Sequence, residues 1–395
     1  MRTEAGFSWK SYAGLAASLI VPSLSLFSKL NPFFLALYIG LSASLLIVLV
    51  KYIYPYFQKR ISQTQANVLA LITLAVIAVM FAIIYPRIDT AGFSIFGIRV
   101  GAADTDNGLQ TATELMLKGK YPYYGQIFSG LPISQLPGEL ILAAPFLLLR
   151  YAAVQNLFWL AIFFILIKGL FKDSRPALVL LWTLITLSPI ILVQLMTGVD
   201  YPANSLFVLT FLLLLKNAEE RHAPPYQKYL FAVLLGLGLS SRVNFILLLP
   251  LIFFAIARLS GLLEAVKTTA VSFLSFLLVT LPFYLYDPRG FAPLYTLHTL
   301  QFPGLFKYGH LIFPFFAGVL SILLGLLKNN SGTSTFLKNC ALVQAILVLG
   351  AVVGCLVQPD PSLRRIYYML GYGVFFMFFG VLGFGMDIFK RDSGI

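Results

Sequence analysis

Charged residues are scarce in this chain of 395 residues, because Asp, Glu, Lys and Arg together make up 11% of it. Soluble domains carry about 25% charged residues. Hydrophobic residues account for 59%, and the mean hydropathy is +0.88. A soluble globule of this size cannot bury so much apolar surface, so the chain belongs in a lipid bilayer. The composition therefore excludes a cytosolic enzyme, a secreted disulfide scaffold and a disordered protein.

Cysteine and the common catalytic motifs are equally scarce. The two cysteines, Cys340 and Cys355, lie in one apolar stretch. On a helix they would be about 22 Å apart, which is too far for a disulfide. The sequence contains no Walker-type phosphate loop and no GxSxG, HExxH or CxxC motif. ATPase, serine hydrolase and zinc protease functions therefore have no support.

Long apolar runs, bounded by charges or turn residues, predict an all-α fold, a polytopic bundle with about 10–12 membrane-spanning helices. We expect a single integral membrane domain over residues 1–395, with no separate soluble domain and no cleavable signal peptide. The predicted spans are 11–29, 31–50, 67–85, 133–149, 151–171, 176–197, 201–216, 229–257, 262–286, 311–327, 340–358 and 366–389.

Basic residues outnumber acidic ones and give a formal net charge of +13. In membrane proteins Lys and Arg gather in cytoplasmic loops, so we interpret the excess as a topology signal and not as a nucleic-acid site. With both termini in the cytoplasm, the loops 86–132, 198–203, 287–310 and 359–365 face outward. This orientation places 17 of the 28 basic residues inside: Arg2, Lys10, Lys51, Lys59, Arg60, Lys168, Lys172, Arg175, Lys216, Arg221, Lys228, Arg258, Lys267, Lys328, Lys338, Lys390 and Arg391.

Two apolar segments do not fit as simple spans. Three segments separate the outer loop 86–132 from the outer turn near Asp200, although an even number of crossings is needed. The segment 133–149 is the weakest of them, and we expect a short or re-entrant helix there unless Asp200 is placed on the wrong side. The segment 229–257 is too long for one span and is interrupted at Ser240–Asn244, so we expect two short helices that meet at a polar apex toward the outer side.

Two carboxylates, Asp104 and Asp106, stand in the first outer loop before residues whose apolar pattern predicts a short interfacial helix. A carboxylate in this position could act as a general base on a hydroxyl or bind a divalent cation. The alternative is a solvated N-cap, because Asp is common before a helix. Asp200 could approach this pair and complete an acidic site, or it could cap the helix that begins near Tyr201.

Arg242 is the second candidate, because a cation inside an apolar stretch costs a few kcal/mol and is usually functional. Together with Ser241 and Asn244 it could bind a phosphate, since a guanidinium matches phosphate oxygens in a bidentate fashion. The alternative is an internal ion pair with Asp200 or Glu139.

Further basic residues lie on the predicted outer face. Arg364 and Arg365 precede two tyrosines and could bind phosphate, or they could be a snorkelling pair in an aromatic belt. The loop 287–310 holds Arg289, His298, Lys307 and His310. Two histidines twelve residues apart are not a metal motif, although Lys307 could hold a phosphate or pyrophosphate.

Several of these segments together resemble the GT-C superfamily of integral membrane glycosyltransferases, which use polyprenyl-phosphate sugars. An acidic outer loop is followed by Gly119-Lys120-Tyr121-Pro122-Tyr123 and then by SQLPGELILAAPFLLL, which is similar to the start of the next membrane helix in bacterial members. SSRVNFILLLPLIFF is similar to the mid-chain helix break of the family, and LRRIYYMLGY to its late arginine run. The similarity covers about residues 67–380. The chain departs from the family in lacking the late proline run and a C-terminal soluble domain, and in having Arg instead of the commoner Lys in mid-chain.

The resemblance implies an inverting sugar transfer on the extracytoplasmic side, in a bacterial plasma membrane. Asp104 or Asp106 would be the general base, and Arg242, Arg364, Arg365 and Lys307 would bind the donor phosphate. Tyr123, Asn244, Asp200 and His298 are the candidate substrate-binding residues. The expected partners are a polyprenyl-phosphate-linked sugar, a glycan, lipid or protein acceptor, and membrane lipids. The sequence identifies no definite cofactor, although the acidic pair could hold a divalent cation.

Two other functions remain open. A transporter or flippase would use the broken segment 229–257 and Arg242 to gate an anionic or lipid-linked substrate. A polymerase or ligase of lipid-linked glycans would use the outer arginines and histidines but would not need an acidic pair.

Overall fold

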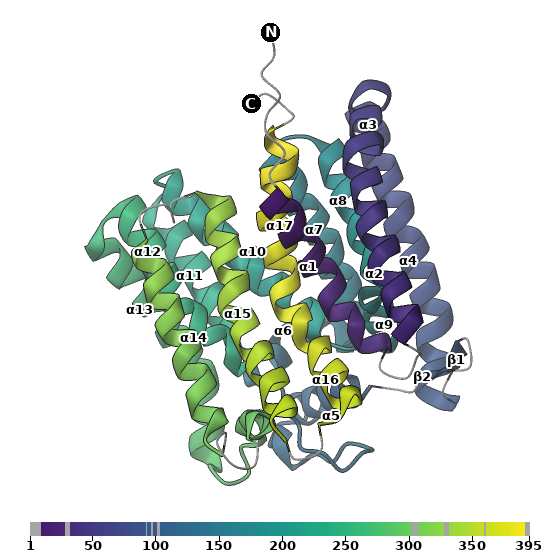
Figure 1. The fold of residues 1–395 in the computed structure, drawn as a ribbon. Helices are drawn as coiled ribbons and strands as arrows, with labels where there is room; N and C mark the ends of the chain where they lie inside the picture. The colour runs from purple at the N-terminus through teal and green to yellow at the C-terminus, as the bar shows by residue number, and fades with distance from the viewer. Residues whose placement is uncertain are drawn as a thin grey trace.

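The computed structural model describes residues 9–27, 32–91, 93–95, 98–100, 103–301, 307–327, 332–358 and 361–391. It is a bundle of α-helices with one short antiparallel hairpin, β1 (Phe93–Ile95) and β2 (Ile98–Val100) (Figure 1). The predicted all-α polytopic architecture is therefore confirmed. In the described part of the chain, nine helical stretches are long and apolar enough to cross a membrane, and a bent helix pair would make a tenth. This is the architecture of an integral membrane protein, with slightly fewer spans than the sequence predicts.

The first helices extend further than the hydropathy pattern predicts. They are α1 (Trp9–Ser23), η1 (Leu24–Phe27), α2 (Pro32–Val48), the π-turn η2 (Leu49–Ile53), α3 (Tyr54–Arg60) and α4 (Gln63–Ala91). The segment 51–60, predicted as a cytoplasmic turn, instead continues α2, so that Pro32–Arg60 is one helical stretch of 29 residues. Pro55 is tolerated there because it lies at the start of α3, where a missing backbone N–H costs little.

The segment that the topology required not to cross is a short helix. The middle of the chain forms α5 (Asp104–Leu117), η3 (Pro122–Tyr124), α6 (Pro137–Leu148), α7 (Val154–Phe171), α8 (Ser174–Leu187), α9 (Pro189–Thr197) and α10 (Tyr201–Glu220). With 12 residues, α6 is about 18 Å long, whereas a bilayer core is about 30 Å thick. Glu139 of α6 and Asn156 of α7 both contact the first turn of α10. The chain therefore enters α6 and begins α7 beside the same turn of α10, without crossing the bundle in between. The expected short helix is confirmed.

The predicted span 176–197 is not one straight helix. Between α8 and α9 the chain bends by 80°. Pro189 begins α9, and a proline disfavours the helical conformation of the residue before it, here Ser188. The prediction of a continuous span was wrong at this point because a single X-Pro step does not lower the hydropathy of its surroundings.

The second half of the chain contains the predicted break. It forms α11 (Pro225–Leu239), η4 (Val243–Leu248), α12 (Leu249–Ser260), α13 (Leu262–Tyr286), η5 (Ala292–Leu300), α14 (Gly309–Leu326), α15 (Thr333–Leu356), α16 (Leu363–Leu370), η8 (Gly371–Gly373) and α17 (Val374–Arg391). Helix α11 ends at Leu239, and the chain passes through Ser240–Arg242 before it turns back along η4 and α12. Two short helices thus meet at a polar apex, as the sequence predicts.

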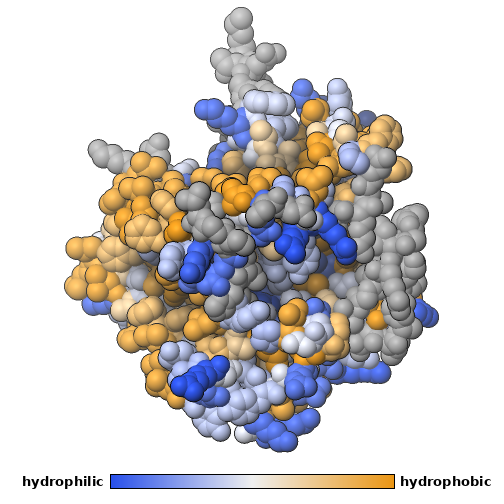
Figure 2. Space-filling view, turned by 60° about the horizontal axis from the view of Figure 1, so that its bottom comes forward, coloured by the Kyte–Doolittle hydropathy of each residue, from blue (hydrophilic) through white to orange (hydrophobic). Residues whose placement is uncertain are grey.

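The loops that the sequence predicts on one side do meet at one end of the bundle. In Figure 1 the start of α1 and the end of α17 lie together at one end, and α5, the hairpin and α16 lie at the other. Contacts join the predicted outer loops, since Asp106 packs against Gly198 and Tyr121 donates to the carbonyl oxygen of Asp287. Figure 2 looks toward this end, where hydrophilic residues gather between the apolar sides of the helices. We call it the loop end.

Candidate functional site

The site is built where the segment before α6 packs against the end of α11. The backbone N–H of Leu136 donates to the carbonyl oxygen of Ser241 at 3.0 Å, and the N–H of Gly138 donates to Ser240 Oγ at 3.1 Å. These bonds place Ser134, Gln135 and Glu139 directly beside Arg242. The break in the helix therefore exposes backbone groups that bind a second polar segment, which explains why a broken helix is tolerated there.

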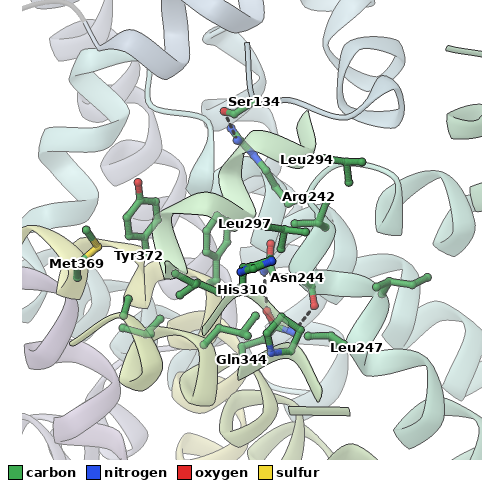
Figure 3. Close-up of a pocket in the computed structure, with 18 of the residues that line it drawn as sticks. Ser134, Arg242, Asn244, Leu247, Leu294, Leu297, His310, Gln344, Met369 and Tyr372 are labelled. Atoms are coloured by element: carbon green, nitrogen blue, oxygen red, sulfur yellow. Dashed lines mark hydrogen bonds between the residues drawn. The ribbon is translucent and has the colours of Figure 1, made fainter. Parts of the chain in front are cut away.

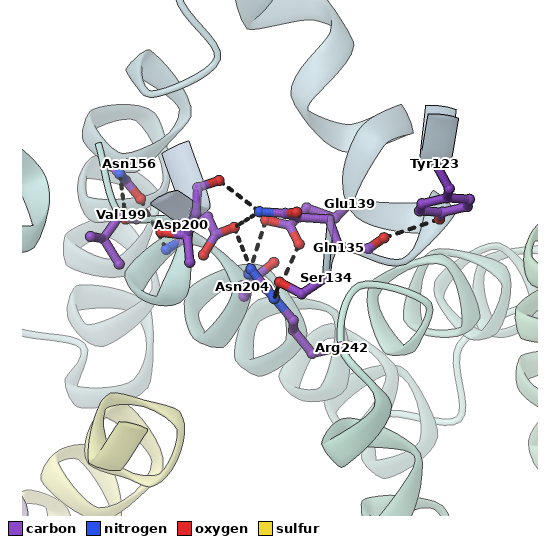
Figure 4. A network of polar contacts seen from close by, with 11 residues as sticks. Tyr123, Ser134, Gln135, Glu139, Asn156, Val199, Asp200, Asn204 and Arg242 are labelled. Carbon is purple, nitrogen blue, oxygen red and sulfur yellow. Dashed lines mark hydrogen bonds and ion pairs between the residues drawn. The ribbon is translucent and has the colours of Figure 1, made fainter. Parts of the chain in front are cut away.

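Arg242 is buried and lies between two buried carboxylates (Figure 4). Its Nη2 pairs with Asp200 Oδ2, and its Nε lies 3.3 Å from Glu139 Oε2. Its Nη1 donates to Ser134 Oγ at 2.7 Å, and its Cζ lies 5.4 Å from the centre of the Tyr201 ring. The internal ion pair, one of the two alternatives for Arg242, is therefore present, and both acidic residues take part.

Amide side chains hold the carboxylates of this cluster in place. Gln135 Nε2 donates to Asp200 Oδ2 at 2.8 Å and to the carbonyl oxygen of Thr105 at 2.6 Å. Asn204 Nδ2 donates to Glu139 Oε1 at 3.0 Å. Because Thr105 lies between Asp104 and Asp106, Gln135 connects the acidic start of α5 to the Arg242 cluster. The sequence offered no signal for Gln135, whereas Glu139 was predicted as one of two possible ion-pair partners of Arg242.

The two acidic residues of α5 have different surroundings. Asp106 is 4% exposed, accepts a hydrogen bond from Tyr85 Oη at 2.7 Å, and packs against Gly198, whose φ is +73°. Asp104 is half-buried, and its Oδ1 accepts no hydrogen bond from a described residue. It interacts electrostatically with Tyr368. The expected solvated N-cap is wrong for both, because the N-cap residue is Ala103 and neither carboxylate caps the helix.

Asp200 stands at the N-cap position of α10, but its side chain does not cap the helix. It is fully buried and binds Arg242 and Gln135 instead. Asn156 fixes the turn before it, because its Nδ2 donates to the carbonyl oxygen of Val199 and its Oδ1 accepts from the N–H of Ala203. Asp106 packs against Gly198, two residues before Asp200, and Gln135 bonds both Asp200 and the carbonyl oxygen of Thr105, so Asp200 and the α5 acids share neighbours.

The charges of the cluster do not balance if all three groups are ionised, because two carboxylates face one guanidinium. Burial raises the pKa of Glu139 well above its ordinary value, and the charge of Asp200 raises it further, while Arg242 acts in the opposite direction.

A cavity of about 520 Å³ begins at Arg242 (Figure 3). Its walls are mostly apolar and come from the break after α11, η4, α13, η5, α14, α15 and the α16–α17 segment. Ser134 and Arg242 lie at one end, whereas Asn244, His310 and Gln344 lie further along (Figure 3). The cavity combines an apolar interior with a polar end, as sites for amphipathic ligands do.

Some of the predicted residues belong to this site and others do not. Asn244 lines the cavity, and its side chain pairs with Gln344, with Nδ2 2.6 Å from Oε1. Tyr123 is buried, and its Oη donates to the carbonyl oxygen of Gln135 at 3.0 Å, so it supports the site from behind. The side chain of His298, in η5, lies outside those that the structure describes.

The exposed cations lie outside the cavity lining. Lys307 is exposed just before α14, whose first turn contributes His310 and Leu311 to the cavity. Arg364 and Arg365 are exposed on α16, and Arg365 Nη1 donates to Gln358 Oε1 at 3.0 Å. Met369 of the same helix lines the cavity. The two arginines are therefore on the outer face of α16, as expected for snorkelling cations.

Among the described residues, no group of three or more His, Cys, Asp or Glu side chains is arranged to hold a metal ion. No protein-family model, no curated protein and no solved structure matches this chain.

Proposed function

We propose that this protein is a membrane glycosyltransferase that uses a polyprenyl-phosphate-linked sugar as donor. It would act on the extracytoplasmic side of a bacterial plasma membrane and transfer the sugar to an envelope glycan, lipid or protein. The observation that carries the proposal is the cavity with apolar walls that ends at Arg242, at the same end of the bundle as the acidic start of α5.

The cavity fits an amphipathic donor in one orientation. The isoprenoid chain occupies the apolar interior formed by residues such as Leu247, Leu297 and Val348. Its phosphate points toward Arg242 and Ser134, because these groups offer N–H and O–H donors at the polar end. The sugar then lies nearer the loop end, beside α5 and α16.

Asp104 is the better candidate for the general base. Asp106 is buried and already accepts the hydroxyl of Tyr85, so we assign it a positioning role. Asp104 is partly accessible, and it is coupled to Tyr368, whose ring lies 6.0 Å from that of Tyr372 in the cavity lining. Asp104 is therefore near enough to act electrostatically on a tyrosine that packs against the cavity lining.

The proposed transfer is a single displacement. The acceptor hydroxyl oxygen forms a bond to the anomeric carbon while the bond from that carbon to the phosphate oxygen breaks. The bonding electron pair leaves with the polyprenyl phosphate, and Asp104 takes the hydroxyl proton. Arg242 and Ser134 stabilise the charge that develops on the leaving phosphate. The exposed Lys307, Arg364 and Arg365 interact with anionic lipid headgroups around the entrance.

The test uses the full chain in liposomes with a series of polyprenyl-phosphate hexoses and pentoses and an envelope-lipid and glycan extract as acceptor. We expect the wild-type protein to release polyprenyl phosphate from at least one donor. Asp104→Asn should abolish release while donor binding is retained. Asp106→Asn should lower release less. Glu114→Gln, on the exposed side of the same helix, is the matched control and should behave as wild type.

Two results would contradict the assignment. The glycosyltransferase proposal fails if no donor is consumed, and passage of an intact lipid-linked sugar across the bilayer would then favour a flippase. The base assignment fails if Asp104→Asn transfers sugar at the wild-type rate.

A further inference from the structure

Glu139 and Asp200 form a pair of buried carboxyl groups around a single cation. Neither residue has measurable exposure, and both contact Arg242. On each of them one oxygen is hydrogen-bonded, Glu139 Oε1 by Asn204 and Asp200 Oδ2 by Gln135 and Arg242. The other two oxygens, Glu139 Oε2 and Asp200 Oδ1, accept no hydrogen bond from the described residues. Glu139 Oε2 lies 3.3 Å from Arg242 Nε but makes no aligned hydrogen bond with it. Two buried carboxylate oxygens without a hydrogen bond are costly unless a proton lies on Glu139.

We propose that Glu139 carries a proton, so that the cluster of Glu139, Asp200 and Arg242 is electrically neutral and admits an anionic headgroup at the polar end of the cavity. The second half of this statement rests on the proposed function, because it takes the headgroup to be the phosphodiester of the lipid-linked donor. The proton itself does not depend on the function. It follows from two buried acids that share one guanidinium.

The groups around Glu139 support a resident proton. Asp200 adds a negative charge next to it, Arg242 adds a positive charge, and Tyr123 stands nearby as a neutral phenol.

The elements packed around Glu139 add mostly uncharged groups. Ser240, just after α11, is uncharged and bonds the uncharged Thr280 of α13. Asn156 at the start of α7 is neutral and binds the turn before α10. From α5, Asp106 is directed to Tyr85 and Gly198, and the charge of Asp104 acts on Tyr368. Arg242 is thus the cation that acts on Glu139, and it is matched by Asp200.

The neutral state determines which ligands Arg242 can bind. If the proton leaves, the cluster carries one net negative charge beside the cavity and repels an anion. Since the folded-state pKa of Glu139 is raised, the proton is present at low pH and is lost as pH rises through that pKa. The affinity for an anionic ligand should therefore fall on the alkaline side, by up to tenfold per pH unit. Glu139 is then a specificity-determining residue that sets the charge accepted by the site.

The proton can be detected directly by infrared spectroscopy of the purified full chain. We expect the carbonyl stretch of a buried protonated carboxylic acid, with a small shift in D₂O, at neutral pH. Glu139→Gln should remove this band. Asp200→Asn should also remove it, because Glu139 alone would then ionise and pair with Arg242. Glu114→Gln should keep it. A missing band in the wild type, or a band that survives in Asp200→Asn, would overturn the proton on Glu139.

The proposed binding of an anionic headgroup is tested with farnesyl methyl phosphate, a diester whose charge is constant over the pH range used. Wild-type protein should bind it more weakly as pH rises, whereas Glu139→Gln should bind it with a pH-independent dissociation constant close to the low-pH wild-type value. An unchanged pH slope in Glu139→Gln would overturn the charge-selection role. An infrared band that behaves as expected, with no binding of the diester at any pH, would refute the proposed donor site but leave the proton assigned.

Discussion

Gly138 packs directly against the backbone of Ser240, where α11 ends. A Cβ atom on Gly138 would lie 2.4 Å from the carbonyl oxygen of Ser240 and 2.3 Å from that of Leu237. Such distances are far below a normal contact, and backbone atoms cannot move aside as the end of a side chain can. The close packing of α6 against the end of α11 allows Glu139, the next residue, to reach Arg242.

Gly138→Ala should therefore separate α6 from α11 and weaken the buried cluster. We expect a loss of stability of about 2–4 kcal/mol, in the range of overpacking combined with a disturbed buried ion pair. Thermal unfolding in detergent measures the change. Gly169→Ala is the matched control, because Gly169 lies in α7 with no atom near its Cβ position, and it should be neutral or slightly stabilising. Equal stability of the two variants would contradict the role assigned to Gly138.

Ala351 offers a way to fill the donor cavity without touching its polar end. It is 5% exposed on α15 and lines the cavity. Ala351→Phe should place its ring in the cavity, so stability should change little while binding of farnesyl methyl phosphate falls at least tenfold. Calorimetric titration of the purified protein measures the dissociation constant for the diester, and a melting curve measures the change in stability.

Leu349→Phe is the control for this experiment, because Leu349 is 56% exposed on the same helix and is not part of the cavity lining. It should bind the diester as wild type does. If Ala351→Phe binds equally well, the isoprenoid chain does not lie where we place it.

Tyr121 makes the stability of the loop end sensitive to alkaline pH. Its Oη donates to the carbonyl oxygen of Phe283 at 2.9 Å and to that of Asp287 at 3.3 Å. Burial, followed by the charge of Asp287, raises the pKa of Tyr121 from 10.0 to about 12. Because the folded-state pKa lies above the unfolded one, the contribution is complete below pH 10 and is lost as pH rises through about 12.

Tyr121→Phe should destabilise the protein by about 0.5–1.5 kcal/mol at pH 8, the usual value of a hydrogen bond. The difference from wild type should shrink as pH approaches 12, which chemical unfolding at several pH values would reveal. Tyr52→Phe, at an exposed tyrosine, should show neither effect. A constant difference across the whole pH range would mean that Tyr121 does not titrate as described.

The linear pattern of apolar and polar residues predicted much of this fold. It predicted the all-α membrane bundle, the short helix near 133–149 and the break at Ser240–Arg242. Each of these depends on neighbours in the sequence, because hydropathy averaged over a helix length reports whether that segment can lie in lipid. The bend at Pro189 and the helical continuation through 51–60 were not predicted, since packing overrides the weak local preference of a few residues.

The charged members of the candidate site were predictable from the sequence, but its amide members and its arrangement were not. The sequence marked Arg242, Asp200, Asp104 and Asp106 because charges are rare in apolar surroundings, and it offered both a phosphate site and an ion pair for Arg242. It did not distinguish the buried Asp106 from the accessible Asp104, since two residues on one helix turn have the same local sequence context.

Scarcity of charge, by itself, determined that this chain lies in a membrane, and the few charged residues indicated where the chemistry is concentrated. The tertiary structure decided which of them meet. Gln135, Glu139 and Asn204 joined the site through contacts between residues far apart in the chain, as in the bond from Asn204 to Glu139 over 65 positions. Such pairings depend on the packing of whole helices. Which carboxylates pair with a buried cation depends on their distance and on desolvation, and neither can be derived from the order of residues in the chain.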